Sequence, residues 1–198
     1  MLFPFARAAL YRSAHVRLTE STEPSHSMNT LNSSPAVGFD QPFEMLEACH
    51  ERVERSLGLL LRLAEHLVSH GADEQARDAA RDVIRYFDLA APHHHEDEER
   101  HVLPRLRALG QAPLANQLAE EHRQMQAAYL AIRPELLALR DHAARPSCSG
   151  WQSFVDLYRS HIAREEADAY PAARKEMLSA ELEAMGTEMS GRRQPGKA

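Results

Sequence analysis

Two short segments of the chain place a histidine four residues before a glutamate and add a second glutamate directly after it. The segments read HHEDEE at residues 94–99 and HIAREE at residues 161–166. Positions i and i+4 lie above one another on a helix, so each pair presents an imidazole and a carboxylate to one point. A proline follows ten residues after the histidine in both, at Pro104 and Pro171. The repetition predicts two related halves of a metal site.

Long amphipathic helices must position these pairs. Apolar residues recur every three or four positions in four segments, at about residues 46–67, 73–109, 114–139 and 151–182, and strand signals are almost absent. Four helices with short connections predict an all-α, up-down-up-down four-helix bundle. Pro92 and Pro134 fall inside the second and third segments, where we expect them to kink the helix.

The apolar stripes of these helices also carry polar residues. Each stripe has a histidine near its middle, and the second and fourth also have a glutamate one turn later. His95 and Glu99 belong to a neighbouring row that points toward the edge, so a Glu99→Ala change is expected to do little. The inward set is His50, His94, Glu98, His122, His161 and Glu165.

A buried carboxylate costs several kcal/mol unless a counter-charge compensates it, and no Lys or Arg lies on these stripes. Imidazole and carboxylate together suit iron, manganese or zinc. If each glutamate bridges, four histidines and two glutamates give each of two ions about four protein bonds. That count leaves an open position for a small molecule.

Composition narrows the function classes further. The net charge is 23 − 29 = −6, which offers no general attraction to nucleic acid. No apolar run approaches the roughly 18 residues that a membrane span needs. The two cysteines, Cys49 and Cys148, suit a reducing compartment, so we expect a cytoplasmic protein.

The ends of the chain differ from the helical part. Ser, Thr, Pro and Asn crowd residues 21–35, which predicts a disordered N-terminal extension over residues 1–38. Three arginines precede the first acidic residue, Glu20, so a targeting segment stays open as an alternative. The folded domain is expected at residues 39–185 and a polar tail at residues 186–198.

These motifs resemble the hemerythrin-like HHE cation-binding family over about residues 39–180. The resemblance rests on HHxxEExxVLP at residues 94–104, Glu121-His122, HxxxEE before Tyr170-Pro171, and CHERV around His50. It implies a four-helix bundle around a non-haem di-iron centre, with two iron ions and an oxo or hydroxo bridge. The ligands it implies are the six inward residues, with both glutamates bridging.

The sequence departs from the oxygen-carrying members, which have an HxxxH pair on the third helix and HxxxxD on the fourth. His122 has Leu118 four residues before it and Gln126 four residues after it. The four-His, two-Glu set resembles the branch linked to oxygen, nitric oxide or iron handling and to repair of damaged iron centres. The expected partner is therefore a small diatomic ligand or iron itself. No motif identifies a protein redox partner or demands catalysis.

Two other classes stay open from the residues alone. A ferritin-like di-metal oxidase would use Glu-x-x-His pairs, which occur at Glu47 to His50 and at Glu98 to His101. A metal-free helical interaction module would leave two glutamates buried and unpaired, and a chelator would not change its stability. His93, His95 and His101 are expected on the solvated surface or supporting a ligand, and Cys49 in plain packing.

Overall fold

The computed structural model describes residues 37–142, 145–175 and 177–193, and their regular structure is helical throughout. The extension expected at residues 1–38 lies outside this range except for its last two residues. The elements are α1 (Pro42–Ser69), α2 (Glu74–Arg85), η1 (Tyr86–Ala90), α3 (Ala91–Asp97), η2 (Glu98–Val102), α4 (Leu103–Ala108), α5 (Ala112–Arg140), α6 (Trp151–Arg164), η3 (Glu165–Ala169), α7 (Tyr170–Lys175) and α8 (Ser179–Arg192).

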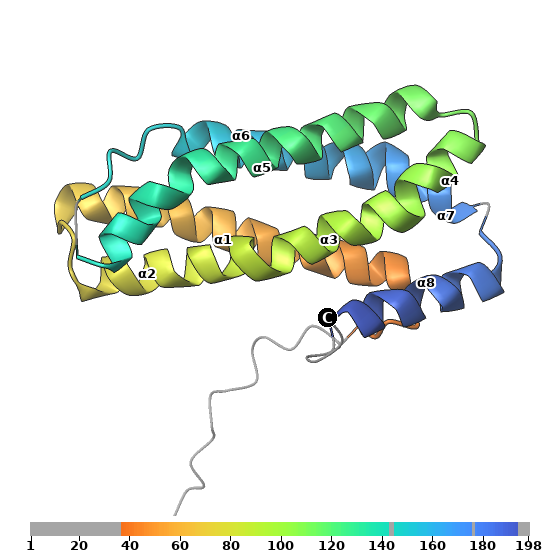
Figure 1. Ribbon diagram of the computed structural model, residues 1–198, viewed down its shortest axis with the longest axis horizontal. Helices are drawn as coiled ribbons and strands as arrows, with labels where there is room; N and C mark the ends of the chain where they lie inside the picture. Colours follow the sequence, from red (N-terminus) through yellow and green to blue (C-terminus); the bar gives the residue numbers. More distant parts are fainter. Residues whose placement is uncertain (1–36, 143–144, 176, 194–198) are drawn as a thin grey trace, which may run out of the picture. The chain divides into compact units, whose positions relative to one another are not determined.

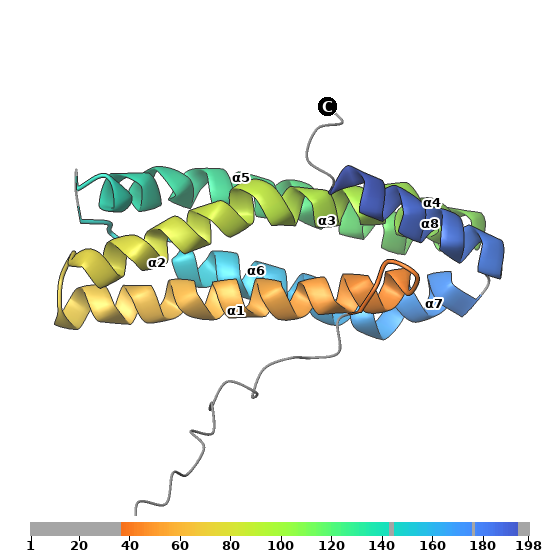
Figure 2. The same ribbon diagram turned by 90° about the horizontal axis from the view of Figure 1, so that it is seen from below.

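These elements form four antiparallel rods. The rods are α1, then α2 to α4 with the two π turns between them, then α5, and then α6 to α7 (Figures 1 and 2). Each rod packs on the next along the chain, and α6 returns to pack on α1. This is the all-α, up-down-up-down bundle that the apolar periodicity predicts. Among the described residues, no helix has the length and apolar character that a membrane span requires.

Local sequence sets the ends of the rods. Gly71 follows α1 with a φ of 79°, a left-handed conformation that glycine adopts without strain. Asp73 then caps α2, because its side chain accepts the backbone N–H of Ala76 at 2.9 Å. Gly110 ends the second rod in the same left-handed way, with a φ of 77°.

Three π turns, η1, η2 and η3, interrupt the second and fourth rods. In each, a backbone N–H bonds to the carbonyl five residues earlier, and the next residue is proline: Ala91 to Tyr86 before Pro92, Leu103 to Glu98 before Pro104, and Tyr170 to Glu165 before Pro171. A proline ring clashes with the carbonyl four residues before it, and the wider π turn makes room there. The kink expected at Pro92 therefore takes the form of a π turn, whereas α5 continues as one helix through Pro134.

The apolar core consists of two clusters with a polar layer between them. One cluster packs the part of α1 from Val53 onward against α2, the second half of α5, and α6. The other packs the first turns of α1 against α4, the start of α5, α7 and α8. On every rod a buried histidine lies between these two clusters, and on the second and fourth rods a buried glutamate lies there as well.

The last helix corrects two expectations about the C-terminal region. The fourth rod does not continue to Leu182, because α7 ends at Lys175 and Leu178 is extended before α8 begins. The polar tail expected from residue 186 is also wrong at its start. Residues Met185, Gly186 and Met189 of α8 are buried, so the folded part of the chain passes residue 185.

Gly186 provides a test of how α8 is seated. A Cβ atom at this position would lie 1.7 Å from the carbonyl oxygen of Phe39, so Gly186→Ala must push α8 away from that segment. We expect the variant to lose about 1–3 kcal/mol of unfolding free energy in urea denaturation. Gly191→Ala on the same helix, where a Cβ meets nothing within 4 Å, should be neutral or slightly stabilising. Equal stability of the two variants would contradict this packing.

Candidate metal centre

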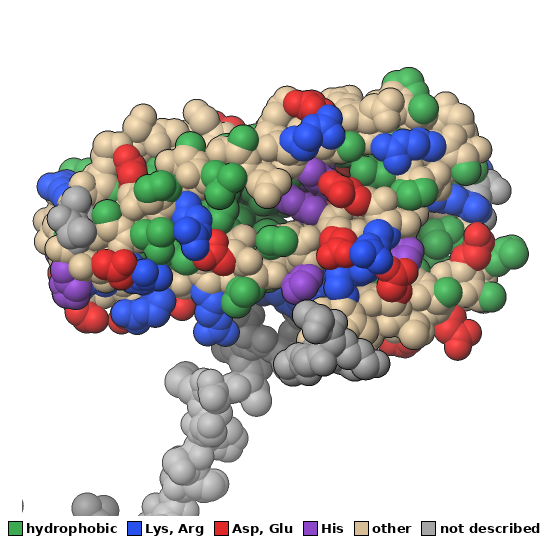
Figure 3. All heavy atoms as spheres, viewed as in Figure 1, with side chains coloured by type: hydrophobic (Ala, Val, Ile, Leu, Met, Phe, Trp, Pro, Cys, Tyr) green, Lys and Arg blue, Asp and Glu red, His purple; other side chains and the backbone are tan. Residues whose placement is uncertain are grey.

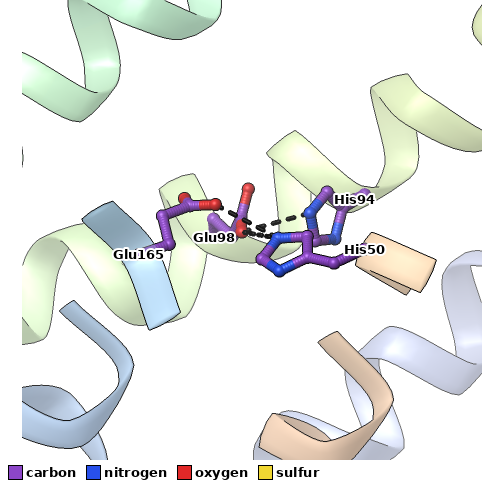
Figure 4. A group of neighbouring side chains, drawn as sticks. All are labelled: His50, His94, Glu98 and Glu165. Carbon is purple, nitrogen blue, oxygen red and sulfur yellow. Dashed lines mark ion pairs between the residues drawn. The ribbon is translucent and has the colours of Figure 1, made fainter. Parts of the chain in front are cut away.

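The structure brings all six inward side chains together in the polar layer. They form two groups that share both glutamates: His50, His94, Glu98 and Glu165 in one, and Glu98, His122, His161 and Glu165 in the other. Within each group, one ligand atom from every residue lies within 4.8 Å of the others. Figure 4 shows the first group, in which the side chains from three rods point toward one another.

Each glutamate lies between histidines of both groups. Glu98 Oε1 is 3.3 Å from His94 Nε2, and its Oε2 is 3.4 Å from His122 Nε2. Glu165 Oε2 is 3.2 Å from His50 Nε2, and its Oε1 is 3.1 Å from His161 Nε2. Each of the two carboxylates thus directs one oxygen to the first half of the site and the other oxygen to the second half. This is the arrangement that two bridging carboxylates require.

The atoms of the site fit a metal ion better than they fit one another. Both oxygens of Glu165, one oxygen of Glu98, and the Nε2 atoms of His122 and His161 are buried without a hydrogen-bond partner among the described residues. Buried polar atoms are normally hydrogen-bonded, so such a concentration calls for a ligand. Imidazole nitrogen and carboxylate oxygen are donors that suit iron, manganese or zinc.

The buried carboxylates differ in their affinity for a proton. Burial and the neighbouring Glu165 raise the pKa of Glu98 above its ordinary value. Burial also acts to raise the pKa of Glu165, but His161, His122 and His50 outweigh it and hold that pKa well below the ordinary value. The three histidines thus favour the charged form of Glu165.

The histidines facing that charge hold protons strongly. Burial disfavours the charged form of His50, but Glu165 and Glu98 outweigh burial and raise the pKa of His50 to about 9. The same glutamates, together with Glu99, raise the pKa of His122 to about 11 against the effect of burial. A metal ion must compete with a proton for each of these imidazoles, so metal affinity falls as the pH falls.

Three outer carboxylates orient three of the four histidines. The Nδ1 atom of His50 lies 2.9 Å from Glu166 Oε1, that of His122 lies 3.0 Å from Glu99 Oε1, and that of His161 lies 2.9 Å from Glu121 Oε2. Such contacts fix the ring so that Nε2 faces the metal, and they raise its basicity. The second glutamate of each HxxxEE segment therefore serves a histidine on another rod.

This arrangement corrects the expectation for Glu99. The register places Glu99 at the edge, and its side chain is indeed half exposed, but one oxygen reaches inward to His122. A Glu99→Ala change should therefore weaken metal binding instead of leaving it unaffected. Helix periodicity identifies the row on which a side chain lies, and it does not show how far a flexible carboxylate reaches from that row.

His94 is the exception among the histidines. Its Nδ1 atom is buried without a hydrogen-bond partner among the described residues. The residue directly before His122 is Glu121, and its carboxylate contacts His161. The corresponding residue in the other half of the site, directly before His50, is Cys49, which has no carboxylate that could contact His94. The two halves of the site are therefore unequal. Burial keeps the pKa of His94 well below its ordinary value, so its ring is neutral and able to bind a metal.

Tyr170 is a site residue that the periodicity did not single out. Its hydroxyl donates a hydrogen bond to Glu98 Oε1 and lies 3.1 Å from His50 Nε2. Its ring stacks on that of His50, with centroids 5.4 Å apart and planes 10° apart. The available signal was its position directly before Pro171, at the end of the π turn that begins at Glu165.

A small cavity opens beside the site between α3 and α5. It has a volume of about 220 Å³, and its lining includes His95, His122, Tyr129 and Tyr158. Figure 3 shows a hollow on this face, with histidine and acidic side chains at its edge. The ring of His95 stacks on that of His122 with centroids 4.3 Å apart, and its Nε2 is buried without a hydrogen-bond partner among the described residues. His95 therefore lies at the mouth of the site.

The pairs that a ferritin-like site would use do not come together here. Glu47 is exposed on α1. His101 lies 3.2 Å from Glu188 of α8 and joins neither ligand group. Of the four residues of those pairs, only His50 and Glu98 belong to the layer.

The role of the outer carboxylates can be tested on Glu166. Glu166→Ala removes the partner of His50 Nδ1, so we expect metal affinity to fall about 10- to 100-fold while the helical content stays unchanged. Competition with a chromophoric chelator measures the affinity, and circular dichroism measures the helical content. Asp168→Ala changes an exposed carboxylate on the same π turn and should keep the original affinity. Equal affinity in both variants would exclude a supporting role for Glu166.

Comparison with known proteins agrees with this geometry. Residues 41–173 match the model of the hemerythrin HHE cation binding domain. A relative from Haemophilus influenzae, named only as an uncharacterized protein, is 31% identical over 171 residues, which cover 84% of this chain and 98% of the relative. The matched range contains all six residues of the buried layer. The chain therefore belongs to the hemerythrin HHE cation-binding family.

Proposed function

We propose that the protein binds two iron ions in the polar layer and uses them to bind or handle a small diatomic ligand. The observation that carries the proposal is the placement of Glu98 and Glu165. Both are 0% exposed, and each directs one oxygen to each half of the site. A single ion would leave two histidines and at least one buried oxygen without a partner, which is unfavourable.

Iron is the metal we propose because the donors are imidazoles and carboxylates without thiolates, in a hemerythrin-like bundle. His50 and His94 would hold one ion, His122 and His161 the other, and both glutamates would bridge. Two anionic bridges neutralise more of the metal charge than a site richer in histidine does. We therefore expect this site to favour the ferric state over reversible oxygen carriage.

The ligand that we propose is oxygen or nitric oxide. Bound iron supplies redox chemistry and an open coordination position. The cavity of about 220 Å³ that reaches His122 has room for a diatomic molecule, and aromatic side chains line part of it. His95 lines the same cavity, and its Nε2, which has no hydrogen-bond partner among the described residues, can hydrogen-bond to a ligand. A role in stress response or iron-centre repair, in the cytoplasm, is the cellular setting that we propose.

Tyr170 has a distinct task in this proposal. Its hydroxyl donates to Glu98 and thereby holds one oxygen of that carboxylate in a set direction. Burial and the two glutamates raise the pKa of Tyr170 well above its ordinary value, so the phenol keeps its proton. Tyr170 therefore positions a bridging carboxylate and does not compete for the metal.

The metal stoichiometry tests the two-ion proposal. We expect about two irons per chain after anaerobic loading and desalting, and a gain in thermal stability that a chelator reverses. Glu98→Ala removes a bridge, so its iron content should fall to one or none. Glu47→Ala, which changes an exposed glutamate, should keep two. A wild-type chain that binds no iron, or loss of iron in Glu47→Ala, would contradict the proposal.

Access through the cavity can be tested separately. Gln126 is exposed and lines the cavity, so Gln126→Trp should obstruct it. We expect the rate of nitric oxide binding to the iron-loaded protein, followed by stopped-flow absorption, to fall about tenfold. Gln124→Trp places the same side chain on the same helix away from the cavity and should keep the original rate. Similar rates in the two variants would exclude this cavity as the route.

A further inference from the structure

A second and larger hollow lies on the surface beside the metal layer, and it is separate from the cavity at His95. We call it the cationic groove. It has a volume of about 920 Å³, and α1, α2, η1, α3 and the end of α8 contribute to its walls. Cys49 and His93, the residues directly before His50 and His94, are among its lining residues.

The groove concentrates positive charge on a chain whose net charge is −6. Its lining includes Arg52, Arg85, Arg192 and Arg193 against a single carboxylate, that of Asp82. Arg52 and Arg85 are exposed, and neither forms an ion pair with any of the described residues. Two guanidinium groups thus line the groove without an ion-pair partner among the described residues, and Asp82 is the one carboxylate in the same lining. Guanidinium groups bind carboxylates and phosphates through paired hydrogen bonds.

The other two arginines are held in place by a buried residue. Asp97 is 0% exposed, and its two oxygens bind Arg192 and Arg193 at the end of α8. Arg193 also donates to the carbonyl of Met189 at 2.9 Å. Arg192 also pairs with Glu188 at 3.1 Å and with Glu96 at 3.5 Å, so carboxylates neutralise this side of the groove. The positive charge available to a ligand is therefore that of Arg52 and Arg85. The match to the family model ends at residue 173, so α8 lies outside the matched domain.

The remaining wall of the groove is apolar. Tyr86, Leu89 and Ala90 line it, and Leu89 is 62% exposed, so its side chain is accessible to a ligand in the groove. The volume falls within the range of about 300–1,000 Å³ that is typical of small-molecule sites. A concave wall of this size suits a small molecule better than the flat contact between two proteins.

We propose that the cationic groove binds a small organic anion that carries carboxylate or phosphate groups on an apolar or aromatic frame. Arg52 and Arg85 hold its anionic groups, and its frame packs on Tyr86 and Leu89. The bound anion would lie beside the backbone that carries His50 and His94. The inference stands apart from the identity of the metal, because none of the contacts that it uses is a predicted metal ligand.

Calorimetric titration of the full, metal-loaded chain tests the groove with two probes. Phenyl phosphate carries an aromatic frame with a phosphate group, and succinate carries two carboxylates. We expect at least one of them to bind with a stoichiometry of one per chain. The tighter probe identifies the anionic group that the groove prefers, and either result supports the site.

A pair of double variants provides the decisive comparison. Arg52→Ala/Arg85→Ala should weaken binding of the probe about tenfold or more, because it removes two charged donors. Arg62→Ala/Arg81→Ala removes the same charge from exposed positions of the same helices outside the groove, and its affinity should stay within about twofold of the wild type. Circular dichroism and metal content, measured on the same samples, establish that both variants are folded and loaded.

Three results would overturn the proposal. The first is that neither probe binds, and the second is an equal loss of affinity in both double variants, which indicates attraction to net charge alone. The third is unchanged binding in Arg52→Ala/Arg85→Ala, which would place the probe elsewhere, for example at the metal. A failure of the metal proposal would appear instead in the metal content of the wild-type chain.

Discussion

Two carboxylates buried in the middle of a helical bundle are the constraint on which the rest of this structure depends. Glu98 and Glu165 are fully enclosed, and among the described residues their ion-pair partners are histidines alone. Isolated buried charges would cost several kcal/mol each. The four histidines, the three outer carboxylates and Tyr170 all reduce that cost. Together these polar residues form the layer that divides the apolar core into two clusters, one on each side.

The repeated HxxxEE segment gives the site an approximate two-fold character. In both copies the first glutamate faces the layer, starts a π turn and precedes a proline by six residues, and the second glutamate supports a histidine on another rod. The symmetry fails where Tyr170 corresponds to Leu103, and among the outer carboxylates it fails where Cys49 occupies the position that corresponds to Glu121. His161 therefore has an outer carboxylate and His94 has none. Two ions held here would differ in electron density. The ion at His94 would receive less of it, because no outer carboxylate raises the basicity of that ring.

Helical periodicity predicts much of this arrangement, and its failures have physical causes. The six inward residues could be identified because histidines on apolar stripes lack a solvent partner. Glu99 and Glu166 lie off those stripes, and only the three-dimensional packing shows that they reach a histidine on another rod. Tyr170 was not distinguishable from a core aromatic residue. The packing of α8 was missed because Gly186 and Met189 contact a segment far away in the sequence, and no local pattern reports such a contact.

Iron K-edge X-ray absorption of the loaded protein tests the central claim most directly, because it reports both the ligands and the distance between the metals. A pair of ions bridged by Glu98 and Glu165 predicts nitrogen and oxygen ligands alone, with a second iron at about 3.5 Å. Isolated iron without a neighbouring metal would contradict the two-ion centre. A sulfur ligand would contradict the proposed ligand set and would implicate Cys49, the buried thiol beside His50.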